Sequence, residues 1–395
     1  MSTHIGIGFS QNIDSAKAAE QAALQAKTKL MTNAAHLVIV LTTTHYNPAR
    51  LLPIIRQIFD TAKIIGTSTA GIILPERIET RGIAVLSIYS DELKMGIGFI
   101  DPGAGDNIYQ KGMALAQQSL NDFSQQGRQA FFCFVNEQLK SDAQFLKGLQ
   151  DVLGNIFPIL GAGNSSASRE TFHLFQDNVL KNSAVGLILG GHISVGVGNR
   201  HGFRPLGKPR IINECVGYII RQIDGKKAAS LYEEYFKERI INPRLIQNDR
   251  SIFYPLGIFI DGGNEYLLRT AIDILDDGSI VCQGDIPHGA QVHIMIGNKD
   301  SCKHAALEAA YETQKNLLGR QPKLILIIED IARSKLLGRM AFQEIESIKK
   351  VFAREATQTP LIGFYASGEI CPLQSAERFK KPQYQNGSIV ILAIG

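Results

Sequence analysis

The stretch LIGFYASGEICP at residues 361–372 carries the pattern around which the rest of the chain is organised. Its first residues predict a buried strand, and Ser-Gly-Glu at 367–369 predicts a tight turn, because glycine takes up positive φ angles at little cost. A close copy, IIGTSTAGII, occupies residues 64–73, and a looser copy, PILGAGNSS, occupies residues 158–166. One loop used three times predicts a duplicated scaffold whose strand ends converge on a site.

Length and composition indicate a globular protein of two or three domains. The 395 residues are 45% hydrophobic and 20% charged, and 41 basic against 37 acidic residues give a formal net charge of +4. No basic block interrupts this even charge distribution, so we expect no nucleic-acid binding. No apolar run reaches the roughly 20 residues that cross a bilayer, and the N-terminus lacks the pattern of a signal peptide. We therefore expect a cytoplasmic protein that does not bind a membrane.

The order of expected elements predicts an α/β fold with three related βαβαβββ units in mixed sheets flanked by helices. We expect an N-terminal domain at residues 1–203 that contains the first two units. A C-terminal domain at 204–395 would contain an interposed β-rich block at 204–290 and the third unit at 291–395. The first strand of that third unit is expected at 292–297. The N-terminal and C-terminal domains together give a two-domain arrangement.

Local signals support individual elements. Asp14 is a suitable N-cap for a helix over 15–30, and Asn47-Pro48 is typical of a helix start. Gly-x-Gly occurs three times without the third glycine and the acidic partner of a dinucleotide site, so it indicates close packing of strands. The five cysteines are scattered along the chain, which argues against a disulfide framework and a structural zinc site.

Several stretches resemble the FIST domain proteins of bacterial signal transduction, including both the N-terminal and the C-terminal FIST halves. They span nearly the whole chain and keep the family's order and spacing. The matching stretches are AHLVIV at 35–40, IGTSTAG at 65–71, DGKKAASLYEEY at 224–235, GFYASGEI at 363–370 and the final strand at 386–392.

The resemblance implies a sensory module that binds a small ligand, with an amino acid as the suggested class. Related modules are joined to, or encoded with, histidine kinases, cyclic-dinucleotide enzymes or chemotaxis receptors. Because the FIST-like halves use up the length of this chain, we expect it to signal through a partner protein. Some stand-alone members resemble haem proteins that sense nitric oxide.

This chain departs from the family pattern at three positions. The family usually has cysteine where this chain has Thr67 and glutamate where it has Ile72. The family's Cys-x-x-Arg is replaced by Asp330-Ile-Ala-Arg333. We therefore expect no thiol-based sensing at that place.

Arg333 and Glu369 follow adjacent strands of the third unit and are the first candidates for a ligand site. A guanidinium and a carboxylate facing one pocket could hold the carboxylate and ammonium groups of a free amino acid. Alternatively, the two side chains pair with each other as a structural salt bridge. The loops add candidate donors, although serine in glycine-rich turns often bonds only its own backbone. These further candidates are Thr67, Ser68, Gly71, Ser165, Ser367 and Gly368.

Two alternative functions stay open beside a non-enzymatic ligand sensor without cofactor or metal. A hydrolase would use Ser68 or Ser367, but Gly-x-Ser-x-x-Gly at 66–71 is one residue longer than the hydrolase elbow. A nitric-oxide sensor would hold haem b non-covalently through one axial histidine. The candidate axial ligands are His45, His192 and His201.

Overall fold

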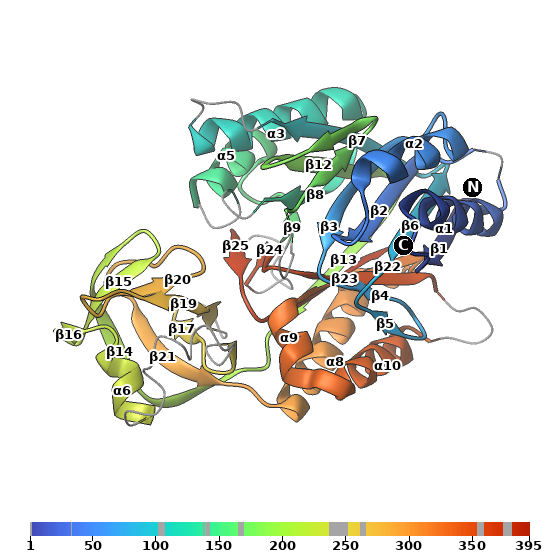
Figure 1. Cartoon of the computed structure of the whole chain (residues 1–395). Helices are drawn as coiled ribbons and strands as arrows, with labels where there is room; N and C mark the ends of the chain where they lie inside the picture. Colours follow the sequence, from blue (N-terminus) through green and yellow to red (C-terminus); the bar gives the residue numbers. More distant parts are fainter. Residues whose placement is uncertain are drawn as a thin grey trace.

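The computed structural model describes residues 2–32, 34–101, 107–136, 139, 143–164, 170–236, 252–260, 266–353, 359–373 and 381–395. The fold is α/β, as the sequence predicts, with three six-stranded mixed sheets flanked by helices. A fourth, eight-stranded sheet forms a lobe beside this body (Figure 1). We call residues 204–296 the β-rich lobe.

The first two units follow one another along the chain. Unit 1 comprises β1 (Thr3–Ser10), α1 (Ser15–Leu30), β2 (Leu37–Thr43), α2 (Pro48–Ile58), β3 (Lys63–Thr69), β4 (Ile72–Ile73), β5 (Ile78–Glu79) and β6 (Ile83–Ser90). Unit 2 comprises β7 (Leu93–Ile100), α3 (Ile108–Phe123), β8 (Arg128–Val135), α5 (Ala143–Leu153), β9 (Ile159–Gly163), β10 (His173–Phe175), β11 (Asn178–Leu180) and β12 (Ala184–Gly191). The expected caps are present: the Asp14 side chain accepts hydrogen bonds from the first turn of α1, and Asn47 caps α2.

The third unit is split by the lobe. It comprises β13 (Val195–Arg200), α8 (Lys299–Asn316), β22 (Leu324–Asp330), α9 (Ile331–Leu337), α10 (Ala341–Phe352), β23 (Leu361–Ala366), β24 (Glu369–Pro372), β25 (Pro382–Gln385) and β26 (Ile389–Ile394). The lobe comprises β14 (Arg204–Val216), β15 (Ile219–Ile223), β16 (Lys226–Lys227), α6 (Ser230–Phe236), β17 (Leu256–Ile258), β18 (Leu267–Arg269), β19 (Ala271–Ile274), β20 (Ile280–Cys282) and β21 (Gln291–Ile296). None of the helices that the structure describes combines the length and the apolarity needed to cross a bilayer.

The first strand of the third unit differs from the expectation. Residues 292–297 were expected to begin this unit, but β21 pairs with β14 and β17 inside the lobe. Instead β13, before the lobe, pairs with β26. An apolar run alone does not show which sheet a strand joins, because its pairing partner lies far away in the sequence.

Three sheets of the body share one strand order, and each is completed by a hairpin from another unit. In each sheet the first strand of the unit pairs with the last strand of the same unit. This last strand also pairs with the second strand, and the second strand pairs in parallel with the third. The hairpin β4–β5 then joins the sheet of unit 3, β10–β11 joins that of unit 1, and β24–β25 joins that of unit 2. The three units therefore form a closed ring by exchanging hairpins.

The inner faces of the three sheets meet in one apolar core. Equivalent buried residues from the second strand of each unit, Ile39, Phe132 and Leu326, all belong to it. The outer faces pack separately against the helices of their own unit. Since the central strands of the body are covered on both sides, they are almost continuously apolar.

The three Gly-x-Gly motifs mark the place where each first strand touches a helix, as expected. A Cβ added to Gly8 in β1 would lie 1.9 Å from the carbonyl oxygen of Ala22 in α1, and one added to Gly198 would lie 1.9 Å from that of Ala309 in α8. A Cβ on Gly98 would similarly clash with Ser119 of α3. The motif therefore allows helix and sheet to approach closely, and its third copy at 196–198 is the sequence signal for β13.

Candidate functional site

The three Gly-Ser loops do converge, because each carries the chain from its own sheet to the next. The first residues of the exchanged hairpins are Ile72, His173 and Glu369, and all three are fully buried. Their partners across the ladder are Phe364, Thr67 and Ala162, which occupy equivalent positions in the three sheets. Directly paired residues point to the same face of a sheet, so one apolar, one basic and one acidic side chain face the central core.

Glu369 lies among polar groups from its own unit. Ser388 donates a short hydrogen bond to one carboxylate oxygen, and the other has no hydrogen-bond partner among the described residues. Burial, together with the nearby Asp330 carboxylate, raises the pKa of Glu369 well above its usual value. Its surroundings therefore favour the neutral form of this carboxyl group more than water does.

Among the described residues, Arg333 makes its side-chain contacts with groups other than Glu369. It is fully buried at the start of α9, where its guanidinium donates to Glu344 of α10 and lies 3.5 Å from the Glu329 carboxylate. The predicted salt bridge between Arg333 and Glu369 is absent from the contacts of the described residues. Neither the ligand-site interpretation nor the salt-bridge interpretation of the sequence included Glu329 and Glu344. Nothing in a single sequence shows which charges are buried together.

The serine and threonine candidates bond mainly to the backbone. Ser68 Oγ accepts from the Phe172 N–H at 3.0 Å, and Thr67 Oγ1 donates to the Ser68 carbonyl. No histidine is hydrogen-bonded to Ser68 in the described part of the chain. Gly71 lies against the Tyr365 ring, where a Cβ would come within 3.0 Å. This part of the loop region therefore has the structural role that serine often has in glycine-rich turns.

The last loop is enclosed by the lobe and by β25. Ser367 Oγ accepts from Gln283 Nε2 of the lobe at 3.1 Å, and the Ser367 carbonyl accepts from the Tyr384 hydroxyl at 2.8 Å. Gly368 has φ +83°, and a Cβ there would meet the Tyr384 hydroxyl at 2.0 Å. Glycine is needed at this place. Ser165 lies outside the described residues.

The three candidate haem ligands do not fit an axial role. His45 and His192 are exposed, each after the end of a strand. His201 is buried, but its Nδ1 accepts from the Phe203 N–H at 2.9 Å. The remaining nitrogen therefore carries the proton, which leaves no lone pair for iron.

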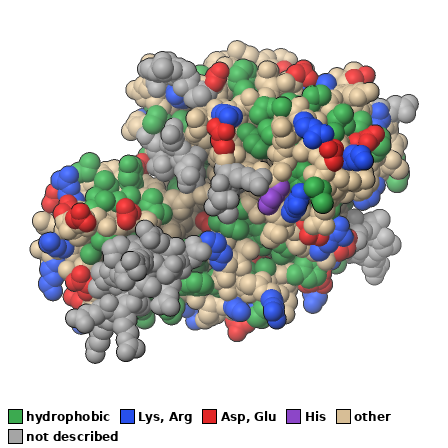
Figure 2. Space-filling view, in the orientation of Figure 1, with side chains coloured by type: hydrophobic (Ala, Val, Ile, Leu, Met, Phe, Trp, Pro, Cys, Tyr) green, Lys and Arg blue, Asp and Glu red, His purple; other side chains and the backbone are tan. Residues whose placement is uncertain are grey.

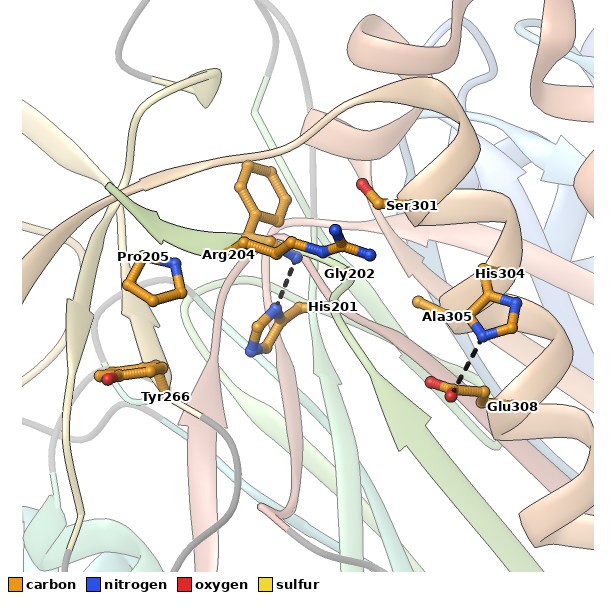
Figure 3. A pocket seen from close by; sticks show the side chains of 10 residues that line it. His201, Gly202, Arg204, Pro205, Tyr266, Ser301, His304, Ala305 and Glu308 are labelled. Atoms are coloured by element: carbon orange, nitrogen blue, oxygen red, sulfur yellow. Dashed lines mark hydrogen bonds and ion pairs between the residues drawn. The ribbon is translucent and has the colours of Figure 1, made fainter. Parts of the chain in front are cut away.

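His201 nevertheless lines a cavity at the junction of β14 and α8, which we call the α8 cavity. Its volume is about 360 Å³. The lining residues are His201, Gly202, Phe203, Arg204, Pro205, Tyr266, Ser301, His304, Ala305 and Glu308. Figure 3 shows the Arg204 side chain extending from β14 toward α8, with His304 and Glu308 on the helix. The cavity thus presents a cation on one wall and a carboxylate on the other.

Arg333 joins the walls of the α8 cavity to the core. Its guanidinium donates to the His201 carbonyl at 2.7 Å and to the Cys302 carbonyl of α8 at 3.0 Å. It also reaches the Gly387 carbonyl before β26 at 3.4 Å. The arginine that the sequence predicted as a ligand contact therefore holds the cavity walls in place from behind.

The buried His201 predicts a loss of stability in mild acid. Burial, together with the charge of Arg333, lowers the pKa of His201 from 6.5 to about 4. The unfolded chain takes up this proton near pH 6.5 and the folded chain only near pH 4. The contribution of His201 to stability is therefore complete above pH 6.5 and falls by about 2–3 kcal/mol as the pH drops to 4.5. Urea unfolding at pH 7 and at pH 4.5 measures this loss of stability.

The matched variant is His201→Asn, whose amide oxygen can accept the Phe203 N–H but does not titrate. It should lose less stability than the wild type over the same pH interval. Equal losses in the two proteins would show that His201 does not contribute to the acid sensitivity.

Two domain families cover most of the chain. Residues 36–226 match the FIST N domain, and residues 228–372 match the FIST C domain. The chain belongs to the FIST family. FIST domains are sensors of signal-transduction proteins that bind small ligands. The two matches meet inside the lobe, at β16, so the lobe contains parts of both the FIST N domain and the FIST C domain.

The other similarities are more distant. The uncharacterized protein MJ1623 of Methanocaldococcus jannaschii is 23% identical over 252 residues, which covers 60% of this chain and 46% of that protein. The chain thus matches about half the length of this relative. A cyanuric acid hydrolase from A. caulinodans aligns over 100% of this chain and 99% of its own, with a TM-score of 0.40 and 5% identity. A second cyanuric acid hydrolase structure aligns over 100% of both chains, with a TM-score of 0.38 and 6% identity.

The sequence interpretation missed the charged residues of the α8 cavity. His304 and Glu308 stand four residues apart and form a pair at 3.3 Å on α8, a spacing that places them on one helix face. Arg204 lies in the cluster of glycine, proline and arginine at the expected domain boundary. These signals are visible in the sequence, but they do not show that the two segments face each other.

Proposed function

We propose that this FIST protein is a non-enzymatic sensor that binds a free amino acid in the α8 cavity and signals through a partner protein. The observation that carries the proposal is the α8 cavity itself. It has opposite charges on facing walls, and both walls are fastened to the core by Arg333. A change at the cavity then reaches β22 and α10 through a single buried side chain.

The charges suit the two ends of an amino acid. Arg204 forms no ion pair within the described part of the chain, so its guanidinium is available for a carboxylate. The first turn of α8 adds partial positive charge at the same end. Glu308 would take the ammonium group in place of its contact with His304. Phe203, Pro205 and Tyr266 provide apolar surface for the ligand side chain.

The lobe is the proposed surface for the signalling partner, such as a histidine kinase or a cyclic-dinucleotide enzyme. Hydrophobic side chains gather on the upper part of the lobe in Figure 2. Several large apolar side chains of the lobe are exposed, including Val216 at 59%, Tyr218 at 49% and Ile272 at 51%. Exposed apolar surface of this kind often serves protein contacts. The proposal includes a cytoplasmic setting for this interaction.

Arg204→Ala is expected to weaken amino-acid binding about 10- to 100-fold, because a hydrogen bond to a charged group contributes roughly 1.5–3 kcal/mol. Isothermal titration with the twenty amino acids would first identify a ligand, and the variant would then be titrated with it. The N-acetyl and amide derivatives of that ligand should bind weakly, because each removes one of the two charges.

The matched control is Arg221→Ala, which removes another exposed arginine of the lobe that pairs with Glu214. It should bind the ligand as the wild type does. Wild-type affinity in the Arg204 variant, or tight binding of the N-acetyl and amide derivatives, would contradict the assignment of this cavity to an amino acid.

A further inference from the structure

A second cavity lies where the lobe meets unit 2, and we call it the junction cavity. Its volume is about 410 Å³. It is bordered by α5 of unit 2, by β18 and the segment 285–287 of the lobe, and by β25 of unit 3. Figure 1 shows β25 between α5 and the lobe. Three parts of the chain thus meet around one space, which shares no lining residue with the α8 cavity.

Arg269 is a buried cation in the wall of this cavity. It is only 3% exposed, and its hydrogen bonds go to backbone carbonyl oxygens: Nε to Asp285, and Nη1 to Leu268 and Tyr384, each at 2.9 Å. Nη2 donates to no group among the described residues. Burial lowers the pKa of Arg269 to about 10, so the group is still charged near pH 7.

The charge of Arg269 is not neutralised by an ion pair with the described residues. The nearest acidic residue of the wall, Asp285, uses one carboxylate oxygen to accept from the Ala143 N–H of α5 at 2.8 Å. A buried charge without a counter-ion is costly. An anion in the junction cavity would remove that cost.

Gln150 supplies a second donor in the lining of the junction cavity. It lies on α5, is 7% exposed, and its Nε2 has no hydrogen-bond partner among the described residues. Buried amide groups are nearly always paired in native structures. Gln150 Nε2 and the Arg269 guanidinium line the same cavity, so one oxygen acceptor from outside the chain would complete the first and supply a counter-charge to the second.

The other walls define the body of this ligand. Leu146, Leu267 and Ile286 are buried apolar residues of the lining. Lys147 and Asp151 pair with each other at 3.3 Å on α5, so they neutralise one another. The lining therefore combines the donors of Arg269 and Gln150 with apolar surface, and Lys381 and several amide side chains complete it.

We propose that the junction cavity binds a small organic carboxylate with an apolar body, held by Arg269 and Gln150. The planar carboxylate accepts from Nη2 of the guanidinium, which has no partner among the described residues, and from the amide N–H, and the apolar part covers Leu146, Leu267 and Ile286. Bound there, the ligand adds a bridge between α5 and the lobe to the existing bond from Ala143 to Asp285. This site is independent of the amino-acid site in the α8 cavity.

Benzoate is a suitable probe because it combines a carboxylate with an apolar ring. We expect benzoate to raise the melting temperature of the full chain in a saturable manner, since a ligand of the native state stabilises it by mass action. Benzamide, which has the same shape without the charge, and inorganic phosphate, which has charge without an apolar body, should give no saturable rise. Equal responses to benzoate and benzamide, or a response to phosphate alone, would overturn the proposal.

Gln150→Leu tests the site without endangering the fold. Leucine fills a similar space and removes a buried unpaired amide, so the variant without ligand should melt at or above the wild-type temperature. Its affinity for benzoate should fall at least tenfold. Gln117→Leu, at an exposed position of the neighbouring helix α3, is the matched control and should keep wild-type affinity.

Arg204→Ala separates the two sites. It should leave the benzoate response unchanged, whatever its effect on amino-acid binding. A wild-type benzoate affinity in Gln150→Leu, or loss of the response in Arg204→Ala, would show that benzoate does not bind in the junction cavity.

Discussion

Replacing Arg333 with methionine is expected to lower the free energy of unfolding by about 3–5 kcal/mol, the cost of breaking a buried ion pair on one side. The substitution removes the partner of Glu344 and Glu329 and the donors to the His201, Cys302 and Gly387 carbonyls. Methionine fills a similar length of apolar space, so the loss comes from unpaired polar groups. Urea unfolding followed by circular dichroism measures it.

A double variant distinguishes this explanation from a simple packing defect. Burial, with the Glu344 carboxyl group beside it, raises the pKa of Glu329 well above its usual value, and Glu344 lies closer to the Arg333 guanidinium than Glu329 does. Arg333→Met with Glu344→Gln should therefore recover a large part of the lost stability. No recovery, or a loss below about 1 kcal/mol in the single variant, would contradict the role of Arg333 as the central buried charge.

Gly198→Ala is expected to lower the free energy of unfolding by about 3 kcal/mol, because overpacking a filled contact costs that much when the obstacle cannot move. The new Cβ would lie 1.9 Å from the Ala309 carbonyl oxygen of α8. A backbone oxygen inside a helix cannot turn aside, so α8 must move away from β13. The measurement is again urea unfolding.

Val195→Ala is the matched control for Gly198→Ala. It changes a half-buried residue of the same strand and removes apolar contact without adding an atom. Its cost should stay below about 1.5 kcal/mol. Equal costs for the two variants would mean that close contact between β13 and α8 does not decide the stability of the third unit.

The exchanged hairpins explain why the three loop copies diverged in sequence. Ile72, His173 and Glu369 occupy equivalent places, but each faces a different sheet: Phe364 opposes Ile72, Thr67 opposes His173, and Ala162 opposes Glu369. His173 stacks on Phe134, whereas Glu369 bonds Ser388. Since each copy packs against another unit, each loop adapts to its own neighbour.

The sequence by itself determined the local elements of this protein and the presence of three related units. Capping at Asp14, the apolar strands and the repeated loop are all read from residues close together in the chain, so their physical causes are local. The need for glycine at Gly368 belongs to this class, since the loop has positive φ there. Family membership follows from the same short patterns in order.

Only the tertiary structure decided which sheet each hairpin joins, which strand begins the third unit, and which charges are buried together. Ile72 pairs with Phe364, and Arg333 donates to His201 and Glu344, across separations that no periodic pattern records. The two cavities likewise arise where β14 meets α8 and where α5 meets the lobe. The donors and charges of each cavity come together only when these elements pack against each other. Burial and the lack of a hydrogen-bond partner are properties of the folded chain, so the sequence does not show them.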